Sequence, residues 1–123
     1  MRLEKSAGSI RDRLAQYVAS EYKDTSENPI RVRLIFRMIF SPEEGYPFFN
    51  YVEEFHRERN IIAECIQKSG DTRERNIDAE MTSTALMGTM LIQILEFLFT
   101  GKQTLTRRNA KKLINLHLPY SKH

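Results

Sequence analysis

Cysteine is almost absent from this chain, and the usual signals for export or membrane insertion are absent as well. The single Cys65 excludes an internal disulfide and is typical of a reducing compartment. Residues 1–5 lead into polar residues rather than an apolar core, so the sequence predicts no secretory signal. Glu96 interrupts the best candidate for a span of about 18 apolar residues. We therefore expect a cytoplasmic protein that does not cross a membrane.

Strong charge of one sign and recognisable catalytic motifs are also lacking. The net charge of +3 is too weak and too scattered to argue for nucleic-acid binding by itself. No Ser-His-Asp pattern, glycine-rich phosphate loop or Walker-type motif occurs. Nothing in the sequence supports catalysis, and we expect neither an enzyme nor a cofactor.

Metal-ligand spacing is present only in part. Glu53 and His56 form a Glu-x-x-His pair, the spacing used in di-iron helical bundles, but such sites need a second pair and none exists. Cys65, His117 and His123 have no metal-ligand spacing to one another. We expect no metal site, and we interpret His56 as a polar group at a cavity edge or a structural histidine.

Helical periodicity is what the sequence has in abundance. The 123 residues suffice for one domain, and we expect residues 1–123 to form it. Residues 32–40 are β-branched and aromatic enough for a strand, but arginines on one side leave the apolar residues grouped on the other, which favours a helix. We interpret the basic stripe of Arg31, Arg33 and Arg37 as a face exposed to water. The sequence predicts an all-α fold with five main helices near residues 9–23, 29–40, 47–69, 78–100 and 106–118.

The segment 78–100 is apolar around most of its circumference. A helix that faces one core needs an apolar stripe only about 100° wide. The excess forms two sub-faces, one with Met81, Ala85, Gly88, Ile92 and Phe99, and the other with Leu86, Met90, Leu91, Ile94 and Leu98. We expect one sub-face to pack inside the subunit and the other across a two-fold axis, which predicts a homodimer.

Three groups of residues in the C-terminal half have an order and spacing typical of a known protein family. They are residues 70–73 (Gly-Asp-Thr-Arg), residues 85–88 (Ala-Leu-Met-Gly) inside the long apolar segment, and residues 99–114, which begin Phe-Thr-Gly-Lys. Together they resemble the C-terminal regulatory domain of TetR-family transcriptional repressors. The resemblance covers most of the chain and implies an orthogonal-type bundle whose last two helices pair with a partner's into a four-helix bundle.

The chain departs from that family at its start. Family members begin with a three-helix DNA-binding head that contains a helix-turn-helix, and nothing in this sequence resembles it. Either the sequence is a fragment or the chain has lost the head. In both cases we expect DNA contact only through an N-terminal domain missing from these residues. The implied function is effector sensing for a transcriptional regulator.

The resemblance also implies a ligand pocket between helices and a helical dimer interface. For a small apolar effector we expect a lining of aromatic residues, methionines and a few polar groups: Tyr17, Met38, Phe49, Phe55, His56, Met81, Thr84 and Gly88. For the homodimer we expect contacts from the last two helices: Leu86, Met90, Leu91, Ile94, Leu98, Ala110, Leu113, Ile114 and His117.

Two alternatives stay open. The first is a headless helical dimer that acts as an interaction or scaffold protein, with a solid core and no ligand pocket. The second is a small helical-bundle enzyme with a buried polar constellation around His56 and Glu53.

Overall fold

The computed structural model describes residues 9–40, 51–68 and 77–118. This part of the chain is all-α and contains no strand, as predicted. Residues 32–40 are helical, and the predicted start of the third helix at Pro47 lies outside the described residues. The helices are α1 (Ile10–Glu27), α2 (Pro29–Phe40), α3 (Tyr51–Gln67), α5 (Ala79–Thr100) and α6 (Arg107–His117).

Side-chain caps fix where three of these helices begin. The Ser9 hydroxyl accepts from the Asp12 N–H at 3.2 Å, the Asp78 carboxylate from the Met81 N–H at 3.0 Å, and the Thr106 hydroxyl from the Asn109 N–H at 3.1 Å. Each bond satisfies a backbone donor that has no partner inside its own helix.

A glycine ends α5, and side-chain hydroxyl groups extend α1. Gly101 terminates α5 in the left-handed conformation, with φ of 71°, and its N–H donates to the Phe97 carbonyl at 2.8 Å. Helix α1 was expected to end near Lys23 but continues to Glu27. The Thr25 and Ser26 hydroxyls donate to carbonyls one turn earlier, at 3.0 and 3.1 Å, so these polar residues are satisfied within the helix rather than in a loop.

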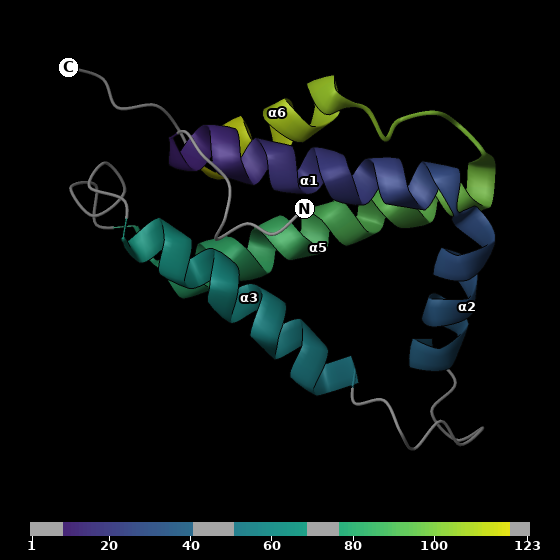
Figure 1. Ribbon diagram of the computed structural model, residues 1–123, viewed down its shortest axis with the longest axis horizontal. Coiled ribbons are helices and arrows are strands. Elements are labelled where there is room, and N and C mark those ends of the chain that lie inside the picture. The colour runs from purple at the N-terminus through teal and green to yellow at the C-terminus, as the bar shows by residue number, and fades with distance from the viewer. Residues whose placement is uncertain (1–8, 41–50, 69–76, 119–123) are drawn as a thin grey trace.

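Helix α5 is central to the packing (Figure 1). It contacts α3, α6 and α1, and α1 in turn lies along α6. Helix α2 leaves the end of α1 steeply and projects away from α6 (Figure 1). The core includes fully buried side chains from four helices, among them Leu14 and Val18 of α1, Ile62 of α3, Leu86 of α5 and Ala110 of α6.

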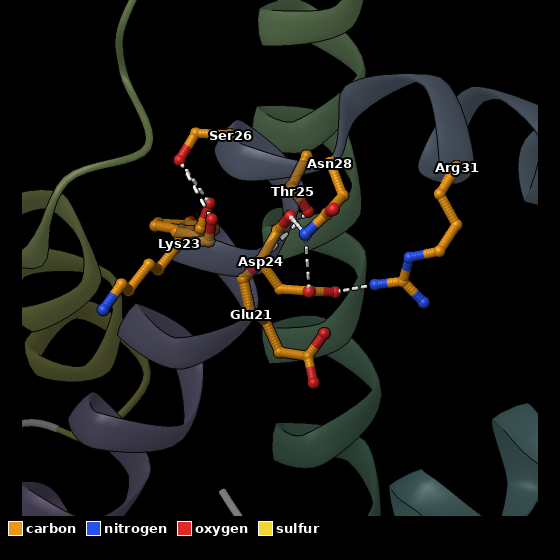
Figure 2. Close-up of polar contacts among 8 residues, drawn as sticks. Glu21, Lys23, Asp24, Thr25, Ser26, Asn28 and Arg31 are labelled. Carbon is orange, nitrogen blue, oxygen red and sulfur yellow. Dashed lines mark hydrogen bonds and ion pairs between the residues drawn. The ribbon is translucent and has the colours of Figure 1, made fainter.

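The junction between α1 and α2 is tied by polar contacts around Asp24 (Figure 2). The Asn28 amide donates to the Asp24 carbonyl and to its carboxylate, both at 3.2 Å, and Arg31 pairs with the same carboxylate. Pro29 occupies the first position of α2, where its missing N–H costs nothing. The ion pair is about half exposed, so we assign it an orienting role at about 0–1 kcal/mol.

Most residues expected at the dimer interface lie in the core of the single chain. Helices α1, α3 and α6 pack against α5, and this sub-face of α5 is buried inside the single chain together with residues of α6. Leu91 is only partly buried. The buried residues are Leu86, Met90, Ile94, Leu98, Ala110, Leu113 and Ile114.

His117, also expected at the dimer interface, joins α6 to α5. Its Nε2 lies 3.1 Å from the Thr89 hydroxyl, which itself donates to the Ala85 carbonyl at 3.0 Å. Because the single hydroxyl proton is already used, Nε2 carries the proton of the bond to Thr89. Burial lowers the pKa of His117 and so favours this neutral form.

Candidate functional site

The remaining sub-face of α5 is exposed, and we call it the outer face: Met81, Ala85, Gly88, Ile92 and Phe99. The exposed fractions are 65% for Met81, 62% for Ile92 and 83% for Phe99. Ala85 and Gly88 between them are exposed as well. Contiguous exposed apolar surface of this kind marks interaction sites in soluble proteins.

Polar side chains next to the outer face do not interrupt its apolar character. The Thr84 hydroxyl donates to the Glu80 carbonyl at 3.0 Å, and the Thr100 hydroxyl to the Glu96 carbonyl at 2.7 Å. These hydroxyl protons are therefore used within α5. A Cβ atom placed on Gly88 would meet no other atom within 4 Å, so packing inside the chain does not require glycine there.

The length and composition of α5 would also allow it to cross a membrane. The side of the helix that carries Leu86 and Ile94 packs into the core with α1, α3 and α6. A core helix of a soluble protein has the same composition, and the described fold is consistent with one.

A groove opens between α2 and the end of α5, and we call it the α2–α5 groove. Its volume is about 520 Å³, and it is lined by Arg33, Phe36, Arg37, Leu95, Leu98 and Phe99. None of these described lining residues is acidic. Sequence analysis missed this combination, because Arg33 and Arg37 were interpreted as part of a water-exposed stripe. Arg33 and Arg37 are four residues apart with Phe36 between them, and this spacing was the available signal.

A second, more polar pocket of about 760 Å³ lies between α1 and the start of α6. Its rim carries Lys23, Arg107 and Lys111 and one carboxylate, Asp12. The Thr106 hydroxyl already occupies the first turn of α6 as a cap. Nothing in the geometry selects a ligand for this pocket.

A buried phenol and two carboxylates meet where α1 approaches α3. The Tyr17 hydroxyl donates to the Glu58 carboxylate at 2.7 Å, and burial raises the pKa of Tyr17. Burial also raises the pKa of Glu21, with smaller contributions from the charges of Glu58 and Asp24. Neither pocket is lined by this cluster. Among the described residues no group of His, Cys, Asp and Glu is arranged to hold a metal ion.

The described members of the expected effector pocket are not gathered in either pocket. Tyr17 is buried in the core, whereas the other five are exposed to solvent in the single chain. Among the described side chains of α3, the buried ones are Ile62, Ala63 and Ile66, in the second half of that helix. The Met38 side chain and Phe49 lie outside the described residues. The exposed members are Phe55, His56, Met81, Thr84 and Gly88.

Comparison with known protein families, curated protein sequences and solved structures finds no match.

Proposed function

We propose that this chain is the dimerisation and effector-sensing domain of a cytoplasmic TetR-type transcriptional regulator. The outer face of α5 is the dimer interface, and the DNA-binding heads lie outside residues 1–123. The observation that carries the proposal is the split of α5 into a buried sub-face and an exposed apolar one. The resemblance described above supports the regulatory role.

The outer face is suited to a two-fold contact between copies of α5. A two-fold axis places the same patch on both subunits, so a self-complementary apolar stripe is sufficient for both. Gly88 lies near the middle of the stripe and, with no Cβ, permits the partner helix to approach closely. A stable interface of this kind buries on the order of 1,600 Å² in total.

A second candidate is a helical dimer that acts only as an interaction or scaffold protein. The exposure of Phe55, His56, Met81, Thr84 and Gly88 favours it, because these residues do not enclose an effector in the single chain. Both candidates require the same dimer and differ in whether a small ligand binds. The enzyme alternative gains no support, since His56 is exposed.

Paired substitutions test the dimer. Ile92→Glu places a charge on the outer face at a position 62% exposed in the single chain, so the subunit should remain folded. Ile30→Glu is the matched control, because Ile30 is 74% exposed on α2. We expect light scattering after size exclusion to give a monomer mass for Ile92→Glu and a dimer mass for Ile30→Glu, with equal helical circular dichroism. Dimer masses for both variants would refute the outer face as the interface.

A further inference from the structure

The α2–α5 groove has an apolar floor with cations at its rim. Phe36 and Leu95 are partly buried, and Leu98 is 6% exposed. The rim carries the guanidinium groups of Arg33 and Arg37, and none of the described residues that line the groove carries a carboxylate. An occupant that complements this surface has an apolar body and a negative charge at one end.

Arg33 is held in place by the end of α5. Its guanidinium donates to the Leu98 carbonyl at 2.6 Å. Leu98 is among the last four residues of α5, whose carbonyls lack the usual helical partner. The N–H of Lys102, which would have continued the helix, bonds to the Thr100 hydroxyl instead, at 3.1 Å. Arg33 therefore has a fixed position and retains N–H donors for a ligand.

Arg37 supplies the second cation. It is exposed, and no acidic residue in the described part of the chain forms an ion pair with it. It follows Arg33 by four residues on α2, so the two side chains lie on the same side of that helix. A planar guanidinium can donate two parallel N–H bonds to one carboxylate.

We propose that the α2–α5 groove binds an amphipathic carboxylate, an aliphatic chain that ends in a carboxylate group. The chain lies on Phe36, Leu95 and Leu98, and the carboxylate accepts from Arg37 with Arg33 beside it. A volume of about 520 Å³ matches a small molecule, since ligand pockets typically measure about 300–1,000 Å³. This carboxylate would be the effector of the proposed regulator. Binding itself is argued from the groove alone, and only the regulatory effect of binding rests on the proposed function.

Isothermal titration calorimetry with decanoate, below its self-association concentration, tests the proposal on the whole chain. Decanol and decyltrimethylammonium are titrated in parallel, because they keep the chain and change the head group. We expect one decanoate per chain, bound about tenfold more tightly than decanol. The cation should bind most weakly.

Two arginine variants locate the carboxylate. Arg37→Gln should weaken decanoate binding about tenfold and leave decanol binding unchanged. Arg108→Gln removes the same charge from an exposed position on α6, outside the groove, and it should leave both affinities unchanged. Both residues are exposed, so neither variant should lose its fold.

Several results would overturn the inference. Equal affinity for decanoate and decanol would make the groove a purely apolar surface, and equal loss in both arginine variants would make the attraction nonspecific. Binding confined to the monomeric Ile92→Glu variant would assign the groove to a second copy of the chain. Sedimentation gives the mass of each sample, so dimerisation and carboxylate binding are judged separately. Carboxylate binding by a monomer would refute the proposed dimer but not the carboxylate site.

Discussion

The Glu21 carboxylate is buried near two other carboxylates, and its environment disfavours its charge. Burial is the largest cause of its raised pKa, followed by Glu58 and then Asp24. Because the pKa is higher in the folded state than in the unfolded one, the folded protein binds the proton more tightly. The stabilisation from this proton is complete below the ordinary value of 4.5 and is lost as the pH rises through the folded-state pKa.

Glu21→Gln should therefore stabilise the protein at neutral pH. The amide removes the unfavourable charge, and we expect the free energy of unfolding at pH 7 to rise by on the order of 1 kcal/mol. The gain should shrink as the pH falls to 4.5, where the wild-type carboxyl becomes protonated. Urea unfolding across this range measures it, with Glu27→Gln at the exposed end of α1 as the control. A gain that does not vary with pH would contradict this account.

At the scale of a helix, α5 has a buried side and an exposed side, and residues only six positions apart lie on different sides. Leu86 has no exposed surface, whereas Ile92 is 62% exposed. Leu86 packs into the subunit, so its contribution to stability does not depend on a partner. In the proposed dimer Ile92 contributes mainly through association, so its contribution should depend on protein concentration.

Truncation of the two side chains should separate these roles. Leu86→Ala should lower the free energy of unfolding by roughly 2–5 kcal/mol at every protein concentration. Ile92→Ala should lower the melting temperature only where the wild type is dimeric, and its effect should disappear on dilution. Thermal unfolding over a concentration series measures both. If Ile92→Ala cost as much as Leu86→Ala at every dilution, Ile92 would belong to the core.

Sequence periodicity predicted where the helices lie along the chain better than it predicted which helices pack against each other. The expected ranges of α5 and α6 agree with the observed ones to within one residue at each end. Asp78 and Thr106 cap the starts of these helices and Gly101 ends α5, and all three act locally. The two sub-faces of α5 were also separated correctly. Which of them is buried depends on α6 folding back along α1, a tertiary arrangement that periodicity does not encode.

The candidate site was predicted only in part for the same reason. Gly88 and Met81 were expected both in one sub-face of α5 and in the lining of an effector pocket, and the structure places both at an exposed face. The α2–α5 groove combines residues from helices far apart in sequence, and the link is a bond from Arg33 to the Leu98 backbone. Every residue has a backbone carbonyl, so the amino-acid sequence does not indicate which carbonyl an arginine will contact, and this bond could not be predicted.

At the scale of the whole molecule, the charge distribution predicts how these residues treat DNA. The net charge is +3, and the proposed function assigns DNA binding to heads outside residues 1–123. Residues 1–123 should show no sequence-specific affinity in a gel-shift assay. Residual binding should be weak and should disappear as salt rises, as expected for contacts to phosphate alone. Tight, salt-tolerant binding to one duplex would contradict the assignment of DNA contact to a separate head.

The central claim is that the outer face of α5 joins two copies of this chain. Sedimentation equilibrium of the wild-type protein at micromolar concentrations tests it most directly, because the mass is obtained without a probe or a substitution. The account predicts a single species of about 29 kDa, twice the chain mass of 14.5 kDa. A species of 14.5 kDa across the same range would contradict it.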